Sequence, residues 1–270
     1  MKTVVITGSA RGLGFEMAKI FRTNGLNVVL SDLNEDKLLK AKEELVTTIR
    51  NDASVEYKVC DVTSSSDISN LINYTKQKFN NIDIWINNAG VNQPDKPIWE
   101  LSEAEIDLVL DVDLKGAILG SKLALNAMKE QNSGAIYNIE GYGSNDAMMT
   151  GLSMYGTSKR AITYFTQALA KEVEDKSLNV IIGRLSPGIM ITDFITTALG
   201  DKDHIELPEK TKKVYNILGD YPDVVANFLV NKMLTNTKNN AHIEWLTNGK
   251  AAWRFMTSGF NKRDFFKKEK

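Results

Sequence analysis

Short runs rich in valine, isoleucine and aromatic residues alternate with longer amphipathic segments along this chain. Strands separated in this way pair in parallel, because each needs a long crossover before the next strand can begin. Crossover helices then cover the sheet on both sides. We therefore expect an α/β fold with a doubly wound parallel sheet of about seven strands and helices on both faces. The expected strands are residues 3–7, 27–31, 54–60, 82–86, 134–139, 178–185 and 241–247, and the expected helices are residues 12–24, 34–50, 64–79, 102–130, 152–174 and 222–235.

The alternation continues without an internal repeat, a low-complexity segment or a linker. A chain of 270 residues fits one large α/β domain. We expect a single domain over residues 1–248 and a C-terminal extension over residues 249–270. Residues 188–220 have a mixed, loop-like composition after the sixth strand, and we expect them to form a lid over the substrate.

Composition limits the possible partners and the compartment. A net charge of −1 gives no reason to expect nucleic acid as a partner. Cys60 is the only cysteine, so no internal disulfide can form and a reducing compartment is expected. One cysteine and two distant histidines also predict no metal site. No apolar run approaches the ~20 residues of a membrane span, and the apolar start is too short for a signal peptide, which predicts a cytoplasmic protein.

A glycine-rich segment, TGSARGLG at residues 7–14, follows the first expected strand and opens the first expected helix. Gly8 permits a tight turn, whereas Gly12 and Gly14 let a pyrophosphate approach the backbone at the positive end of a helix. Asp32 closes the second expected strand at about the ~20-residue distance typical of dinucleotide-binding folds. The alternative, a glycine-rich turn followed by a surface aspartate, is less favoured because the strand, turn and helix occur in the required order.

Asp32 and Arg11 favour different coenzymes. The Asp32 carboxylate can accept both ribose hydroxyls of NAD and would repel the 2′-phosphate of NADP. The Arg11 guanidinium could bind that phosphate, pair with Asp32 or remain solvated. We expect NAD, with NADP as the alternative.

Tyr155 and Lys159 lie four residues apart at the start of an expected helix, so their side chains share one face. A free tyrosine has a pKa of roughly 10, which is too high for efficient proton transfer near neutrality. A neighbouring ammonium favours the phenolate, so we expect Lys159 to lower the pKa of Tyr155. Such pairs also occur by chance on many helices, and this pair alone does not identify an active site.

Five motifs together resemble the NAD(P)-dependent short-chain dehydrogenase/reductase family over residues 3–247. They are TGSARGLG, CDV at 60–62, NNAG at 87–90, YGTSK at 155–159 and SPGIMIT at 186–192. The resemblance implies a Rossmann-type fold and hydride transfer between a nicotinamide cofactor and a small-molecule carbonyl or alcohol. It also implies a homodimer or homotetramer that associates through the long fourth and fifth helices.

The resemblance implies roles for individual residues. Tyr155 would donate or accept the substrate proton, and Lys159 would lower its pKa and hold the nicotinamide ribose. Asp61 and Val62 would contact adenine, and residues 187–192 would embrace the nicotinamide. The complete set of implied cofactor-binding residues is Gly8, Ser9, Ala10, Arg11, Gly12, Leu13, Gly14, Asp32, Asp61, Val62, Asn88, Ala89, Gly90, Tyr155, Lys159, Pro187, Gly188, Met190 and Thr192.

Two positions depart from the family pattern. Asp113 stands where the family has an asparagine that relays protons towards the lysine, and an ionised aspartate cannot donate. The family's catalytic serine lies thirteen residues before the tyrosine, where this chain has Tyr142, and alignment of the strands places Gly141 there instead. We expect the turn to bring the Ser144 hydroxyl to the vacated position. The alternative is that Ser144 caps the turn and that Ser153 or water orients the substrate.

The segment NIEGYGS at residues 138–144, with IWINNAG upstream, is similar to the chlorophyll b reductase branch of the family. This similarity implies a chlorophyll-like pigment aldehyde as one substrate, while a steroid, sugar or acyl ketone remains open. Residues 194–199, FITTAL, offer an apolar face that predicts a bulky hydrophobic substrate. The same face could instead pack the lid onto the domain.

Two further alternatives concern the whole protein and its tail. The departures at 113 and 141 are compatible with a cofactor-binding sensor that has lost catalysis, although Tyr155 and Lys159 argue for an enzyme. In the tail, phenylalanines at 260, 265 and 266 alternate with lysine and arginine, as in a short amphipathic membrane anchor. A terminus that is solvated or packed on the domain is favoured.

Overall fold

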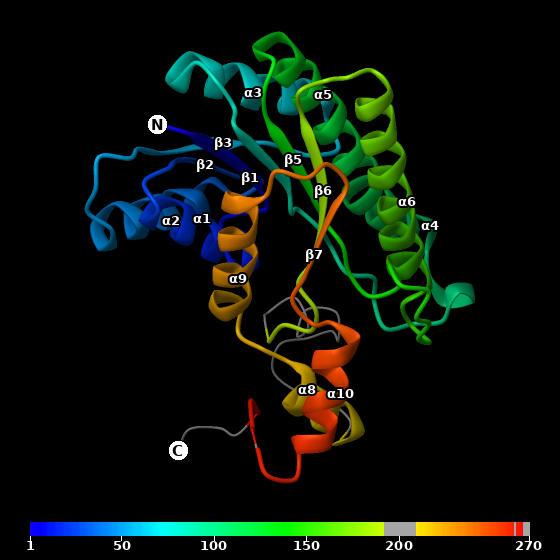
Figure 1. Ribbon diagram of the computed structural model, residues 1–270. Coiled ribbons are helices and arrows are strands. Elements are labelled where there is room, and N and C mark those ends of the chain that lie inside the picture. The colour runs from blue at the N-terminus through cyan, green and yellow to red at the C-terminus, as the bar shows by residue number, and fades with distance from the viewer. Residues whose placement is uncertain (192–208, 262, 267–270) are drawn as a thin grey trace.

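The computed structural model describes residues 1–191, 209–261 and 263–266 (Figure 1). A seven-stranded sheet has the order β3-β2-β1-β4-β5-β6-β7, and every neighbouring pair of strands is parallel. This confirms the predicted fold class. The strands are β1 Thr3–Thr7, β2 Asn27–Asp32, β3 Val55–Val59, β4 Ile84–Asn87, β5 Ala135–Ile139, β6 Ile181–Ser186 and β7 Ala241–Glu244.

Helices cover both faces of the sheet (Figure 1). Because successive side chains of a strand point to opposite faces, Val4 and Ile6 of β1 join the core beneath α1, α2 and α9, whereas Val5 joins the core beneath α3, α5 and α6. The helices on the first face are α1 Gly12–Thr23, α2 Glu35–Thr48 and α9 Pro222–Thr235, and those on the second are α3 Ser65–Phe79, α5 Ala117–Gln131 and α6 Ser153–Asp175.

The strand order reverses between β1 and β4, because β1 pairs with β2 on one side and with β4 on the other. In doubly wound sheets, ligands bind beyond the carboxyl ends of the strands at such a reversal. Residues 7–14 follow β1 and residues 87–90 follow β4, so the topology brings two of the five motifs together there.

The single helix expected over 102–130 is interrupted. α4 Glu103–Val109 runs into a π-helical stretch, η2 Leu110–Gly116, before α5 begins. A short 3-10 helix, η1 Ile98–Glu100, precedes α4. π-helical turns are rare and occur often at functional sites. Here the interruption contains Asp113, one of the two positions that depart from the family pattern.

The expected lid is described only in part. Residues 192–208, which include the FITTAL segment and Thr192, lie outside the described residues. The later part of the expected loop is a helix, α8 Glu209–Leu218, that packs against α10 Asn248–Thr257 (Figure 1).

The described part of the tail packs onto the segment that follows α8. Asp220 accepts hydrogen bonds from Arg254 at 2.6 Å and from Arg263 at 3.1 Å, and Phe265 stacks edge-on against Tyr221. These contacts show that the described part of the tail packs on the domain. In residues 1–191, 209–261 and 263–266, no helix combines the length and apolar character needed to cross a bilayer.

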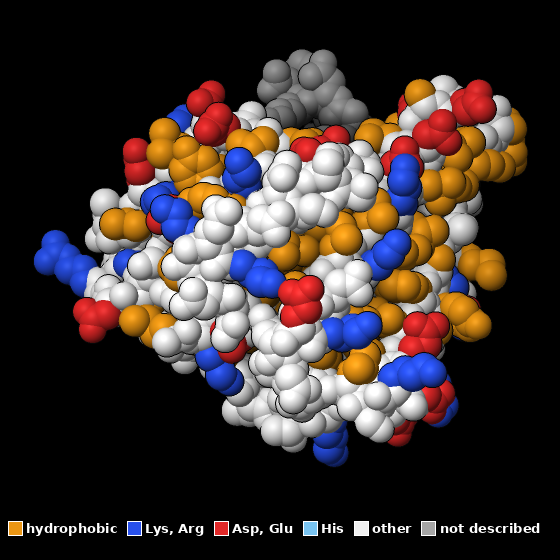
Figure 2. Space-filling model, turned by 90° about the horizontal axis from the view of Figure 1, so that it is seen from above, with side chains coloured by type: hydrophobic (Ala, Val, Ile, Leu, Met, Phe, Trp, Pro, Cys, Tyr) orange, Lys and Arg blue, Asp and Glu red, His pale blue; other side chains and the backbone are white. Residues whose placement is uncertain are grey.

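Charged side chains of both signs are interspersed on the face seen in Figure 2, among hydrophobic and uncharged polar side chains. A nucleic-acid-binding face would present a basic patch or stripe. The face seen in Figure 2 shows interspersed charges and no such patch.

Candidate active site

The glycine-rich turn between β1 and α1 is packed tightly against the β4 loop. Gly8 has a φ of +62°, and a Cβ added there would lie 2.7 Å from Ala89 Cα. A Cβ on Gly14 would lie 2.5 Å from the Gly8 carbonyl oxygen. The sequence predicted a tight turn at Gly8, and glycine is required there both for the left-handed backbone and for space.

Asn88 fixes this turn by hydrogen bonds. Its Nδ2 donates to the carbonyl oxygens of Thr7 at 2.9 Å and Gly8 at 2.8 Å. The Thr7 hydroxyl accepts in return from the backbone N–H groups of Asn88 at 3.0 Å and Ala89 at 3.1 Å. Asn88 and Ala89 therefore lie against the glycine-rich turn, and their hydrogen bonds stabilise its conformation.

Other implied cofactor residues differ in what their side chains contact. Ser9 is fully buried, and its hydroxyl donates to the Ile6 carbonyl at 2.7 Å and accepts from Ser31 N at 2.9 Å. Asp32 ends β2, with Oδ1 fixed by Leu33 N at 2.9 Å. Asp61 accepts from the N–H and hydroxyl of Thr63, both at 2.8 Å. Ser9 thus braces β1 against β2, whereas Asp32 ends β2 and Asp61 lies just beyond the end of β3.

Gly12 differs from the other two glycines of the motif. It starts α1 with a φ of +60°, and among the described residues a Cβ there would meet nothing within 4 Å. Space therefore lies beside the backbone at the positive end of α1, as a bound pyrophosphate would require.

The second part of the site is a buried ion pair. Lys159 Nζ lies 2.9 Å from Asp113 Oδ2, and the two side chains are 7% and 0% exposed. Asp113 Oδ1 also accepts from Val91 N at 2.7 Å, which ties η2 to the β4 loop. A Cβ on Gly90 would lie 3.4 Å from Asp113 Oδ1 and 3.6 Å from Lys159 Nζ. The structure thus brings together three of the expected residues, Gly90, Asp113 and Lys159.

Tyr155 lies one turn before Lys159 on α6, and Lys159 Nζ is 5.3 Å from the centre of its ring. Burial raises the pKa of Tyr155 above its usual value; the Lys159 charge opposes this shift and the Asp113 charge reinforces it. Burial alone would lower the pKa of Lys159, but the charge of Asp113 raises it overall. The expected effect of Lys159, a lower pKa of Tyr155, is therefore present, but burial and the charge of Asp113 outweigh it.

The glycines of NIEGYGS let the turn lie flat against α6. A Cβ on Gly141 would lie 2.4 Å from the Tyr155 hydroxyl oxygen. Gly143 has a φ of +96°, and a Cβ there would lie 2.5 Å from Gly156 Cα. The Tyr155 hydroxyl therefore occupies the space that a serine side chain at 141 would need.

The Ser144 hydroxyl is engaged with the backbone. It accepts from Gly141 N at 3.1 Å and donates to the Lys159 carbonyl at 3.4 Å, so it joins the turn to α6. These are the contacts expected of the turn-capping alternative. Ser153, the other candidate, is exposed at the start of α6. A role for Ser144 on the substrate stays a prediction.

The segment after β6 bends sharply. Gly188 has a φ of +73°, and a Cβ there would lie 2.7 Å from Leu246 Cβ. Met190 then pairs with Asp220 in an isolated parallel bridge. Pro187, Gly188 and Met190 thus follow the end of β6 and turn towards the segment that carries α8.

Two residues with positioning contacts were missed by the sequence reasoning. Gln93 is fully buried, and its Oε1 accepts from the backbone N–H groups of Met154 at 2.7 Å and Tyr155 at 3.0 Å, so it caps α6 at the catalytic tyrosine candidate. No motif marks Gln93. Glu140, the second, is a lone carboxylate after an apolar strand, a signal that was visible but given no role.

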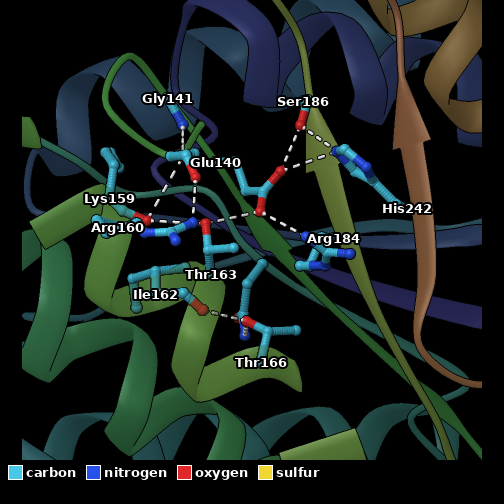
Figure 3. A network of polar contacts seen from close by, with 12 residues as sticks. Glu140, Gly141, Lys159, Arg160, Ile162, Thr163, Thr166, Arg184, Ser186 and His242 are labelled. Carbon is cyan, nitrogen blue, oxygen red and sulfur yellow. Dashed lines mark hydrogen bonds and ion pairs between the residues drawn. The ribbon is translucent and has the colours of Figure 1, made fainter. Parts of the chain in front are cut away.

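Glu140 is 3% exposed and accepts four side-chain contacts, which Figure 3 shows converging on its carboxylate. Burial alone would raise its pKa, but hydrogen bonds from His242, Ser186 and Thr163 and the charge of Arg184 outweigh burial and lower the pKa to about 2. Glu140 is therefore an ionised buried carboxylate near neutral pH.

Two curated proteins show how this chain resembles known sequences. It is 29% identical over 283 residues to the probable chlorophyll(ide) b reductase NYC1, chloroplastic, of Oryza sativa subsp. japonica, covering 99% of this chain and 54% of that protein. It is 31% identical over 264 residues to the chlorophyll(ide) b reductase NOL, chloroplastic, of the same organism, covering 94% and 74%. The chain spans about half the length of NYC1. The predicted similarity to the chlorophyll b reductase branch is confirmed.

Solved structures share the fold. Levodione reductase has a TM-score of 0.79 at 25% identity, over 93% of this chain and 98% of that one. NAD+-bound xylitol dehydrogenase has a TM-score of 0.78 at 22% identity, over 90% of this chain and 96% of that one. A metagenomic short-chain oxidoreductase in complex with NADP has a TM-score of 0.70 at 22% identity, over 90% of this chain and 95% of that one. One of these neighbours was solved with NAD+ bound and another with NADP bound.

The family model described as short chain dehydrogenase matches residues 2–202, which include the glycine-rich turn, Asp113 and the Tyr155–Lys159 pair. Together with the parallel sheet and its solved neighbours, this match shows that the chain belongs to the short chain dehydrogenase family of oxidoreductases.

Proposed function

We propose that this protein is an NAD(P)-dependent oxidoreductase that acts on a carbonyl/alcohol pair, with Tyr155 as the group that gives or takes the substrate proton. The observation that carries the proposal is the Tyr155–Lys159–Asp113 group, which lies beside Gly90 of the loop that also clamps the glycine-rich turn. A bound nicotinamide would supply the hydride chemistry.

The residues at the ends of β1, β2 and β3 fit such a cofactor. The open backbone at Gly12 and the N-terminus of α1 would hold the pyrophosphate, and Asp32 would hold the ribose hydroxyls. Asp61 and Val62 would border the adenine. Asp32 favours NAD over NADP, because its carboxylate would meet the 2′-phosphate of NADP.

The protonation state of Tyr155 favours carbonyl reduction. Burial raises the pKa of the phenol, so Tyr155 holds its proton at neutral pH and can donate it to a developing alkoxide. Lys159 remains protonated beside it and is held in place by Asp113. The Ser144 hydroxyl would orient the substrate oxygen, once released from one of its two backbone contacts.

For the substrate, we propose a bulky hydrophobic carbonyl compound. The named activity of the relatives makes a chlorophyll-like pigment aldehyde the specific alternative. The aromatic pair Tyr221–Phe265, beyond the end of β6, supplies apolar surface at this end of the molecule. A cytoplasmic location stays a prediction, because both rice relatives are named as chloroplastic. Assembly into a homodimer or homotetramer also stays a prediction.

The test compares wild type with Tyr155→Phe on a panel of bulky aldehydes, ketones and small sugars, with NADH and with NADPH. We expect wild type to reduce a hydrophobic carbonyl and Tyr155→Phe to lose at least about 100-fold of that turnover, because general acid–base groups contribute about 10²–10⁴-fold. Equal turnover in both proteins would remove Tyr155 from the mechanism. Cofactor binding without turnover of any substrate would favour a non-catalytic sensor.

A further inference from the structure

Glu140 lies between the two segments that border the reaction centre. It directly follows β5 and precedes Gly141, the residue beneath the Tyr155 hydroxyl. On the other side it faces β6, whose last residue, Ser186, precedes Pro187 and Gly188. Figure 3 shows the carboxylate between α6 and the two strands β6 and β7.

The four contacts of the carboxylate come from three separate elements. Oε1 accepts from Thr163 Oγ1 of α6 at 2.8 Å and from Arg184 Nη1 of β6 at 3.3 Å. Oε2 contacts His242 Nε2 of β7 at 3.0 Å and accepts a short hydrogen bond from the Ser186 hydroxyl. A carboxylate with both oxygens engaged in this way joins α6, β6 and β7 through one buried charge.

Two of these partners connect directly to the reaction centre. Thr163 lies one turn after Lys159, and its hydroxyl oxygen is 3.1 Å from the Lys159 carbonyl oxygen, so its one proton is shared between this carbonyl and Glu140. Ser186 begins the segment that bends at Gly188. Movement of the Glu140 carboxylate would therefore be transmitted to the Tyr155–Lys159 helix on one side and to residues 187–191 on the other.

The cluster is not a hydrolytic triad, although it contains a serine, a histidine and a carboxylate. In a triad the histidine contacts the serine through one ring nitrogen and the carboxylate through the other. Here His242 Nε2 contacts both Ser186 Oγ, at 2.7 Å, and Glu140 Oε2. The Ser186 hydroxyl also donates to Glu140, which leaves it no histidine base to accept its proton.

We propose that Glu140 is a positioning residue that sets the relative placement of the Gly141 turn beneath Tyr155 and of residues 187–191, the segment proposed to embrace the nicotinamide. The inference rests on the proposed function for its catalytic consequence, but the coupling between the two segments is a property of the fold itself. Loss of the charge should loosen both segments together.

The experiment measures hydrogen exchange of backbone amides and turnover in Glu140→Gln, with Glu56→Gln as the matched control. Glu56 is likewise a charge-paired glutamate, bound to Lys42 at 2.8 Å and Tyr74 at 3.1 Å, but it lies on β3 away from this network. We expect Glu140→Gln to speed exchange about tenfold in both 141–144 and 187–191 and to lower kcat about tenfold or more. ADP-ribose, which lacks nicotinamide, should bind with unchanged affinity.

Two single-link variants keep the test decisive if Glu140→Gln does not fold. Ser186→Ala should speed exchange in 187–191 and leave 141–144 unchanged, whereas Thr163→Val should do the reverse. Exchange at both segments equal to that of Glu56→Gln would overturn the inference. A wild type that turns over no carbonyl substrate would instead refute the proposed function, and the exchange data would still decide the role of Glu140.

Discussion

At the β1 turn, Gly8 faces backbone atoms of Ala89, whereas at the β5 turn Gly141 faces the hydroxyl end of the Tyr155 side chain. Backbone atoms cannot move without changing the turn, but a tyrosine side chain can rotate away. The first glycine therefore preserves the shape of the turn proposed to bind the cofactor, and the second preserves the placement of the Tyr155 hydroxyl. Glycine is therefore needed in the two turns for different reasons.

Alanine at each position should separate these roles. In Gly141→Ala the new methyl group displaces the Tyr155 hydroxyl, so turnover should fall about 100-fold or more, with folding and cofactor affinity retained. In Gly8→Ala the clash is with backbone and the φ of +62° adds strain. Cofactor affinity and thermal stability should then fall together.

Gly249→Ala is the matched control, because a Cβ at this helical position meets nothing within 4 Å in the part of the chain that the structure describes. Cofactor titrations, melting curves and steady-state kinetics on the three variants provide the measurements. Lost cofactor binding in Gly141→Ala, or full turnover by this variant, would contradict the different roles assigned to the two glycines.

Ser144→Ala tests the role of a second residue in the turn after β5. If the hydroxyl orients the substrate oxygen, turnover should fall by about 10- to 1,000-fold, as on loss of one oxyanion-type donor, while cofactor affinity is spared. Kinetics of Ser144→Ala and Ser153→Ala, with melting curves for both, measure this. Unchanged turnover in Ser144→Ala together with its loss in Ser153→Ala would reverse the assignment.

The contrast also explains what the sequence could predict. The parallel sheet and the glycine-rich turn depend on patterns within a few residues, such as the position of Gly8 after an apolar strand, and both were predicted. The surroundings of Tyr155 depend on residues brought from afar. Gln93 lies 62 residues from Tyr155 in sequence, and His242 lies over 100 residues after Glu140. No local spacing reveals such contacts.

The net direction of the Tyr155 pKa shift could not be predicted for the same reason. The four-residue spacing correctly placed Lys159 beside the tyrosine, but it contained no information on burial or on the distance to Asp113. A net shift depends on the sum of these effects. Local spacing gives the neighbours on one helix, whereas the sign of a pKa shift requires the whole environment.

Asp113→Asn should move the pH profile with little effect on the cofactor end. Asp113 raises the pKa of Tyr155 and Lys159 lowers it. Asparagine keeps an oxygen for Val91 N but removes the charge that faces Lys159. The ammonium is then uncompensated, so the pKa of Tyr155 should fall. As the pH is raised, alcohol oxidation, which needs the phenolate, should set in at a lower pH than in wild type. Carbonyl reduction, which needs the phenol, should likewise be lost at a lower pH than in wild type.

Asp32→Asn is the control, because it neutralises a carboxylate at the cofactor end and should change coenzyme affinity without moving either limb of the profile. Steady-state rates from pH 5 to 10 and ultraviolet titration of the phenol follow the shift in each variant. If the pH dependence of both reactions is the same in Asp113→Asn as in wild type, the Lys159–Asp113 pair does not act on the phenol. A limb moved to higher pH would mean that Lys159 loses its proton once Asp113 is neutralised. In that case the chief effect of Asp113 would be to keep Lys159 charged, and the charge of Lys159 would itself be what holds the phenol pKa down.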